Sequence, residues 1–208
     1  QLQRVLYEVL KNKPFQTIVS SHSTHITSHA DLSSLVLLTN EGQPKTTATS
    51  PGKNDLLTDK EIADLERYLD ATRSTLLYAR KVILVEGPAE LFIIPPIVKK
   101  VMNIDLERFG VSVIPIYGIH FDVYAKLFNK IALPKKCAII ADGDLKPSDS
   151  EDIKDEEDAF PAPPDLDSLK SEYVGVFRCK TTFERALTKP GLLLCLSSAA
   201  KECGATNV

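Results

Sequence analysis

The chain has 208 residues, of which 43% are hydrophobic and 25% are charged, a composition typical of one large or two small globular domains. The net charge of −3 excludes a protein that binds polyanions through its overall charge, and no apolar run approaches the roughly 20 residues of a membrane span. The four cysteines have no metal-like spacing, so we expect reduced thiols in the cytoplasm, with Cys137 and Cys179 buried.

The first quarter of the chain predicts several short elements. Apolar residues at helical spacing predict an amphipathic helix over residues 1–13, and because it lacks the layout of a signal peptide, we expect the chain to be a fragment of a longer protein. Residues 16–23 predict a short buried strand, and a helical turn is expected after it. Residues 33–49 predict a strand, a turn at residues 40–43 and a return strand, and residues 50–55 predict a linker.

A long helix is expected after this linker, because Thr58 and Glu61 have the spacing of a capping box. A mostly apolar stripe on one face of this helix consists of Leu65, Leu69, Thr72 and Leu76. We expect this helix to join two units.

From residue 81 onward, strands and helices alternate. Strands are predicted over residues 81–87, 111–118, 136–144 and 173–180. Helices are predicted over residues 88–102, 120–133 and 181–189, the first of them interrupted or kinked at Pro95 and Pro96. This alternation predicts an α/β fold with a mostly parallel sheet covered by helices on both faces.

Residues 145–170 interrupt the alternation with an acidic run and a proline-rich run. Residues 149–158 contain seven acids and one lysine. Such a segment is typical of a mobile, solvated insertion, and a regulatory or partner-binding loop is the alternative.

Acidic residues occur where the predicted strands end. Glu86 ends the first strand, Asp142 and Asp144 end the third, and Glu184 follows the fourth. Glu90 comes four residues after Glu86, so we expect all five carboxylates at one edge of the sheet, where parallel α/β sheets bind ligands. Because gathered carboxylates repel one another, the pattern favours bound divalent cations, Mg²⁺ or Mn²⁺.

The motif Asp142-Gly143-Asp144 allows both carboxylates to point to one side, and Gly143 permits a close backbone approach. A simple turn at the end of a strand also explains this motif on its own, because aspartate and glycine are frequent in turns. Its combination with Glu86 and Gly87, at the end of another strand, favours the metal site.

Two of these stretches resemble the signature motifs of a Toprim domain, the catalytic fold of type IA and type II topoisomerases, primases and some nucleases. They are VILVEGPAE at residues 82–90 and IIADGD at residues 139–144. The sequences of these motifs most resemble those of the OLD (overcoming lysogenisation defect) family of bacterial and phage nucleases. In that family an ABC-type ATPase precedes the Toprim domain. CKTTFERAL resembles the third acidic motif of that family, with Phe183 in place of leucine.

The N-terminal part of the chain also resembles this family. QTIVSSHSTHI resembles the strand and switch-histidine loop that ends an ABC ATPase core, and LERYLDATRSTLLYARKVILVEG resembles the connector before the Toprim domain. The resemblance implies an ATPase tail over residues 1–57 and a connecting helix over residues 58–80. It implies a Toprim nuclease domain over residues 81–208, with an acidic, proline-rich insertion near residues 145–170.

The resemblance implies a metal-dependent DNA endonuclease that uses two ions, Mg²⁺ or Mn²⁺, with DNA as its partner. The metal ligands carried over from the family are Glu86, Glu90, Asp142, Asp144 and Glu184. Of these, Glu86, Asp142 and Asp144 are expected to be catalytic.

Other charged residues have simpler interpretations. The histidines His22, His25 and His29 have a spacing that suits a metal face, but a zinc site is the weaker interpretation, and the resemblance makes His22 a γ-phosphate sensor. Because the chain lacks a G-x-x-x-x-G-K-[ST] loop, ATP is expected only with the intact protein. Ordinary solvated charge is favoured over contact with DNA phosphates for the lysines Lys99, Lys100, Lys130, Lys135, Lys136 and Lys146.

Two other functions stay open. One is a non-catalytic Toprim interaction module whose acidic loop binds a partner, and the other is strand passage or primer synthesis, for which neither Tyr117 nor Tyr124 is indicated as a catalytic tyrosine. The family's functional lysine lies in a Lys-Gly context that neither Lys189 nor Lys201 has. A homodimer is compatible with the sequence, no membrane association is indicated, and His120 is expected in a surface or helix-cap role.

Overall fold

The structure is a computed structural model. It describes residues 5, 8–10, 12–14, 16–40, 45–70, 72–118, 120–143, 165–180, 182–187, 197–199 and 201–202. The chain divides into two compact units, residues 1–139 with 165–176 and residues 140–164 with 177–208. Within the described residues, no helix combines the length and the apolar character needed to cross a membrane.

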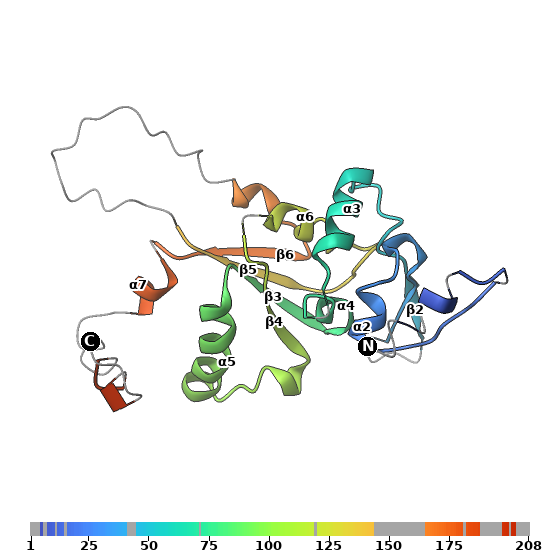
Figure 1. The fold of residues 1–208 in the computed structure, drawn as a ribbon. Helices are drawn as coiled ribbons and strands as arrows, with labels where there is room; N and C mark the ends of the chain where they lie inside the picture. Colours follow the sequence, from blue (N-terminus) through green and yellow to red (C-terminus); the bar gives the residue numbers. More distant parts are fainter. Residues whose placement is uncertain are drawn as a thin grey trace, which may run out of the picture. The chain divides into compact units, whose positions relative to one another are not determined.

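The first unit is built on a parallel sheet. Strand β3 (Lys81–Val85) pairs with β4 (Val111–Pro115) in parallel register, from Lys81 opposite Val111 to Val85 opposite Pro115. Strands β5 (Cys137–Ala141) and β6 (Val174–Arg178), which begin in this unit, complete the order β4-β3-β5-β6 (Figure 1). The predicted mostly parallel α/β sheet is therefore confirmed.

The strands of this sheet are buried because helices flank it. Val82, Leu84 and Val85 are at most 1% exposed, and Ile114 and Ile139 are equally buried. Helix α5 (Pro88–Met102) lies on one side of the strands, and α6 (Phe121–Ala125) and α3 (Asp59–Tyr68) lie on the other (Figure 1). Burial from both sides explains why the strands read as nearly continuous apolar runs.

Helix α5 continues through Pro95 and Pro96, so of the predicted interruption or kink at these prolines, the interruption is wrong. The N–H groups that the prolines lack would have bonded to the carbonyl groups of Leu91 and Phe92. Phe92 is 73% exposed, so water reaches this side of the helix and can bind the released carbonyl groups. The helix ends at Asn103, whose left-handed φ of 56° stops the chain from continuing as a helix.

Helix α6 ends at Ala125, well before its predicted end. The side chain of Asn129 accounts for the difference, because its Oδ1 accepts the N–H groups of Ile131 and Ala132, each at 2.8 Å. Its Nδ2 donates to the carbonyl oxygen of Lys126 at 2.9 Å. These side-chain bonds replace helical ones and form a turn.

The predicted strand pair of residues 33–49 is confirmed. Strand β1 (Leu37–Thr39) and strand β2 (Thr47–Thr49) are antiparallel, with Leu37 opposite Thr49. Residues 41–43 of the predicted turn lie outside the described residues.

Residues 16–23 are irregular, so the buried strand predicted there is wrong. Ile18 is 90% exposed and Val19 is 45% exposed. The described strands pair among themselves, β1 with β2 and the other four in one sheet, so this segment has no ladder partner in the described part of the chain. The helical turn expected after it is present as α2 (Thr24–Thr27).

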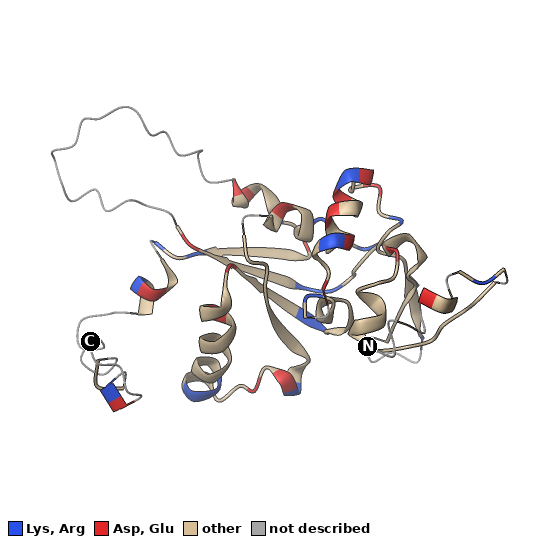
Figure 2. Ribbon diagram, viewed as in Figure 1, with Lys and Arg blue, Asp and Glu red and all other residues tan. Residues whose placement is uncertain are grey.

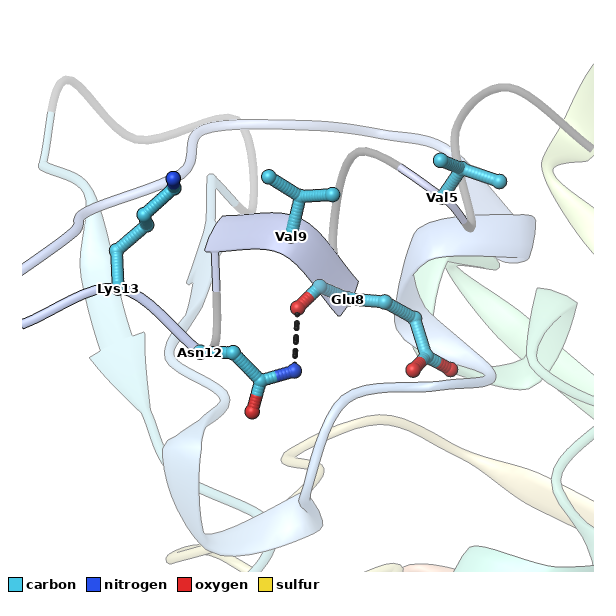
Figure 3. A pocket seen from close by; sticks show the side chains of 5 residues that line it. All are labelled: Val5, Glu8, Val9, Asn12 and Lys13. Carbon is cyan, nitrogen blue, oxygen red and sulfur yellow. Dashed lines mark hydrogen bonds between the residues drawn. The ribbon is translucent and has the colours of Figure 1, made fainter.

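The predicted amphipathic helix of residues 1–13 is described only in part. Val5 and residues 8–10 are helical, and Nδ2 of Asn12 donates to the carbonyl oxygen of Glu8 at 2.9 Å. Val5 and Val9 line a shallow depression with Glu8, Asn12 and Lys13 (Figure 3). The two valines are 57% and 48% exposed, so neither side chain is buried.

Residues 50–55 are packed within the first unit, so the linker predicted there is wrong. Asn54 is only 4% exposed. Its Nδ2 donates to the carbonyl oxygen of Lys126 at 2.8 Å, and its Oδ1 accepts from Nδ2 of Asn129 at 3.2 Å. These contacts satisfy a buried amide, and a polar sequence that reads as a linker can therefore be an ordered part of the fold.

Two helices replace the single helix predicted over residues 58–80. Helix α3 ends at Tyr68 and α4 covers Thr75–Tyr78. The carboxylate of Asp70 explains the break, because its Oδ1 accepts the N–H groups of Thr72 at 2.9 Å and Arg73 at 2.8 Å. Aspartate that binds the backbone two and three residues ahead starts a new turn.

The two other predictions for this region are confirmed. The capping box is present, because the N–H of Glu61 donates to Oγ1 of Thr58 at 3.3 Å and Oε2 of Glu61 accepts the N–H of Thr58 at 2.9 Å. The leucines of the predicted stripe, Leu65, Leu69 and Leu76, are at most 5% exposed. The stripe is thus buried even though the helix is broken.

The second unit contains the ends of β5 and β6 and the helix α7 (Phe183–Leu187), which confirms the helix predicted after the fourth strand. The N–H of Cys179 donates to the carbonyl oxygen of Ala141 at 2.9 Å, so the two chain segments run together here. Residues 144–164, which include most of the predicted acidic insertion, lie outside the described residues.

Candidate metal centre

Glu86 and Glu90 lie at the carboxyl end of β3. Glu86 follows the strand directly and is half-buried, and its carbonyl oxygen accepts the N–H of Tyr117 at 2.9 Å. Gly87 is the N-cap of α5 and Pro88 is its first residue, a position where proline loses no hydrogen bond. This strand–turn–helix places Glu90 in the first helical turn, where its Oε2 accepts the N–H of Gly87 at 3.1 Å.

Glu90 is a buried acidic residue and is only 6% exposed. None of the ion pairs formed among the described residues includes it. The amino end of α5 and the N–H of Gly87 stabilise a negative charge there, but a buried carboxylate ordinarily also needs a cationic partner. A bound cation is a partner of that kind.

Asp142 and Gly143 follow β5 in the second unit. Asp142 is half-buried, and its Oδ1 accepts the N–H of Phe183 at 2.7 Å, which holds the start of α7. A Cβ atom at Gly143 would lie 2.3 Å from the carbonyl oxygen of Cys179 and 2.6 Å from that of Lys180. The close backbone approach predicted for Gly143 is confirmed.

Glu184 lies in the first turn of α7 and is exposed. Phe183, which replaces the leucine of the third motif, is 8% exposed and serves as a buried apolar anchor for this turn. Asp144 lies outside the described residues. Among the residues that are described, no three acidic, histidine or cysteine side chains are grouped so as to hold a metal ion.

Three of the lysines considered for DNA contact instead bond to groups of this chain. Nζ of Lys135 donates to the carbonyl oxygens of Leu76, Leu77 and Ala79 at 3.1, 2.9 and 2.7 Å, and burial lowers the pKa of Lys135 to about 8. Lys99 pairs with Asp105, and Lys136 donates to the carbonyl oxygen of Glu172. Lys146 lies outside the described residues.

The histidines do not form a metal site among the described residues. Nδ1 of His29 lies 3.0 Å from the carbonyl oxygen of His25, and His22 is exposed. His120 is exposed at the start of α6, where its side chain makes no capping bond. The surface role predicted for His120 is confirmed, and the helix-cap alternative is not.

Sequence reasoning weighed Tyr117 only as a catalytic tyrosine and did not consider Arg73. Tyr117 has a φ of 53°, and the guanidinium carbon of Arg73 lies 5.1 Å from the centre of its ring. The only signal in the sequence was the Tyr-Gly pair that ends the strand predicted over residues 111–118, since such a pair can form a turn. The unusual backbone conformation became visible only with the structure.

The comparison with protein families decides which domain this sheet belongs to. Residues 77–144 match the family described as overcoming lysogenization defect protein-like, TOPRIM domain. The chain carries an OLD-like Toprim domain. The match includes both strand-end motifs, with Glu86, Glu90, Asp142 and Asp144, whereas Glu184 follows it. The predicted resemblance to the OLD family is confirmed for this domain.

Solved structures of OLD proteins are also similar to the chain. The C-terminal region of the Burkholderia pseudomallei OLD protein is 29% identical over 62% of this chain and 68% of that chain, with a TM-score of 0.45. The C-terminal region of the Xanthomonas campestris pv. campestris OLD protein is 28% identical over 62% of this chain and 66% of that chain, with a TM-score of 0.45. The chain thus spans about two thirds of the length of each of these structures. The comparison with curated proteins found no match.

Proposed function

We propose that the chain is the catalytic region of a divalent-metal-dependent DNA endonuclease. The observation that carries the proposal is the buried Glu90, which is 6% exposed, follows Glu86 by four residues and joins none of the ion pairs among the described residues. The OLD-like Toprim domain of residues 77–144 supports a nuclease of this family. The proposed activity is nicking or cleavage of phosphodiester bonds.

The proposed ligands of two ions, Mg²⁺ or Mn²⁺, are Glu86, Glu90, Asp142, Asp144 and Glu184. Asp142 and Asp144 would be the core ligands, and Glu90 and Glu184 would complete the second site. Glu86 would bind a metal and take the proton of the attacking water. Bound cations would activate that water and stabilise the departing 3′ oxygen.

The donor set is compatible with hard cations, which prefer carboxylate oxygens. Two of the carboxylates are already oriented by backbone groups, Glu90 by the N–H of Gly87 and Asp142 by the N–H of Phe183. Such bonds limit the rotation of a ligand before the ion binds. The second bond also ties the Asp142 motif to the start of α7, the helix that carries Glu184.

Plasmid cleavage tests the proposal. Supercoiled DNA should be nicked or linearised with Mn²⁺ or Mg²⁺ and should stay intact with EDTA. Asp142→Ala should abolish cleavage, and so should Asp142→Asn, which removes the charge but keeps an oxygen for the N–H of Phe183. Asp55→Ala, which removes an exposed acid far along the chain from the motifs, should cleave like the wild type. Clean wild-type protein that cuts with neither ion would contradict the proposal.

The two other functions predict different results. A non-catalytic interaction module should show no thermal stabilisation by Mn²⁺, whereas a protein that binds Mn²⁺ in its folded state melts at a higher temperature. Strand passage would relax supercoiled plasmid into intact circles, without nicked or linear products. Primer synthesis would leave the plasmid unchanged and extend nucleotides on a template.

A further inference from the structure

Five side chains make two neighbouring sets of ring contacts in the first unit, which together we call the stacking cluster: Arg67, Tyr68, Arg73, Tyr117 and His120. The rings of Tyr68 and His120 are stacked, with centroids 5.6 Å apart and an interplanar angle of 17°. The guanidinium carbon of Arg67 lies 4.9 Å from the centre of the Tyr68 ring. Arg73 makes the same kind of cation–π contact with Tyr117, at 5.1 Å from the ring centre.

Arg73 joins the two parts of the cluster. Its Nη1 donates to the carbonyl oxygen of Tyr68 at 2.8 Å, at the end of α3, and its Nε donates to that of Pro115 at 3.4 Å, at the end of β4. The side chain is only 15% exposed. Arg73 is therefore a positioning residue that fixes the end of a helix, the end of a strand and the ring of Tyr117.

The cluster lies beside Glu86, because the N–H of Tyr117 donates to the carbonyl oxygen of Glu86 at 2.9 Å. The ring of Tyr117 is nevertheless exposed, with 56% of the residue accessible to solvent. Its φ of 53° is a conformation that costs free energy for a large side chain. The surrounding contacts thus hold an aromatic ring in solvent, next to the backbone of Glu86.

The charges of the cluster are already paired. Arg67 contacts Asp64 at 2.7 Å, and Arg73 contacts Asp70 at 3.3 Å. Acidic and basic residues are also interspersed over α3 (Figure 2). A ligand would gain little from attraction of phosphate groups here, so the cluster suits a flat, uncharged ring system, such as a nucleobase that is not held in a duplex.

We infer that the stacking cluster binds unpaired nucleobases of a single-stranded nucleic acid, with Tyr117 as the exposed platform. The inference rests on the proposed function in one respect. If the chain is the proposed nuclease, base binding gives that nuclease a preference for substrates with single-stranded segments next to Glu86. Binding itself requires no metal and no cleavage. It can therefore be measured whether or not the chain cuts DNA.

The chain contains no tryptophan, so Tyr117→Trp introduces a single fluorescent reporter at the platform. In EDTA, a twelve-nucleotide oligo-dT should quench the emission of this tryptophan. Inorganic phosphate and a blunt duplex of the same length should leave the emission unchanged. The length of about twelve nucleotides lies within the range that single-strand binding sites occupy. An RNA oligonucleotide in a second titration decides between DNA and RNA as the source of the unpaired bases. Quenching by either single strand supports the inference, and quenching by neither overturns it.

Fluorescence anisotropy of labelled oligo-dT tests the contribution of the platform. Tyr117→Ala should weaken binding about tenfold, and Tyr117→Phe should keep most of the affinity, because stacking needs the ring and not the hydroxyl group. The matched control is Tyr173→Ala, since Tyr173 also lies under a cation, Nζ of Lys136 at 5.3 Å, but precedes β6 instead of following a strand. This control should bind like the wild type.

The salt dependence separates stacking from phosphate attraction. Because the guanidinium groups are paired, Tyr117→Ala should leave the slope of log affinity against log salt unchanged. Equal affinity of Tyr117→Ala and wild type for oligo-dT, with both proteins folded by circular dichroism, overturns the inference. So does an equal loss of affinity for oligo-dT and for the duplex. If the wild type never cuts DNA but Tyr117→Ala loses oligo-dT binding, the proposed nuclease activity is contradicted. The inference that Tyr117 binds bases is then still supported.

Discussion

The hydroxyl group of Tyr124 is buried in the first unit without a hydrogen-bond partner among the described residues. Tyr124 is 1% exposed, and burial raises the pKa of its phenol to about 12. An unsatisfied buried hydroxyl costs free energy, so Tyr124→Phe should leave the free energy of unfolding unchanged or raise it by up to about 1 kcal/mol. Urea denaturation measures the change. A loss of more than about 1 kcal/mol would mean that the hydroxyl has a partner.

The two glycines of the strand-end motifs differ in the space around them. Gly143→Ala should destabilise the protein by about 1–3 kcal/mol, because a Cβ there meets the carbonyl oxygen of Cys179 at 2.3 Å. Gly87→Ala is the matched control, since its Cβ would have only Oε2 of Glu90 as a neighbour, at 3.5 Å, and should cost under about 1 kcal/mol. Thermal denaturation of both variants compares them. Equal destabilisation would contradict the account of Gly143.

At the scale of single elements, the start of α3 makes stability depend on pH. The hydrogen bond from Lys126, at 2.5 Å, and the N–H of Thr58 lower the pKa of Glu61 from its ordinary 4.5 to about 2. Because the folded-state pKa is the lower one, the stabilisation is complete above about pH 4.5 and is lost as the pH falls towards 2.

Glu61→Gln should therefore lower the free energy of unfolding by about 1 kcal/mol at pH 6 and by less at pH 3. Chemical denaturation at the two pH values gives the difference directly. Lys126→Met should reduce the pH dependence in the same way, because it removes the largest cause of the lowered pKa. A deficit for Glu61→Gln that is the same at both pH values would contradict this assignment.

Local patterns predicted the elements well where local contacts determine them. The capping box of α3 and the four apolar strands were predictable, because a short sequence contains all the groups involved. The break at Asp70 was not predictable from the apolar stripe, which continues across it. The burial of Asn54 depends on partners at Lys126 and Asn129, far away in the sequence, so its polar segment read as a linker.

At the scale of the whole molecule, the proposed ligands come from separate parts of the chain. Glu86 and Glu90 follow β3, Asp142 follows β5, and Glu184 lies in α7. The sequence predicted the strand-end positions of Glu86 and Asp142, because strand periodicity and a following glycine define them. It could not predict the burial of Glu90 or the bond between Asp142 and Phe183, which depend on tertiary packing.

Anomalous scattering from crystals soaked with Mn²⁺ tests the central proposal most directly. The account predicts at least one manganese peak within about 2.5 Å of carboxylate oxygens of both Glu86 and Asp142, the range of hard-cation ligands. Crystals of Asp142→Asn provide the control and should lose or weaken that peak. Fully soaked wild-type crystals without a peak there, or with Glu86 and Asp142 bound to separate partners, would contradict the metal centre and the nuclease proposed from it.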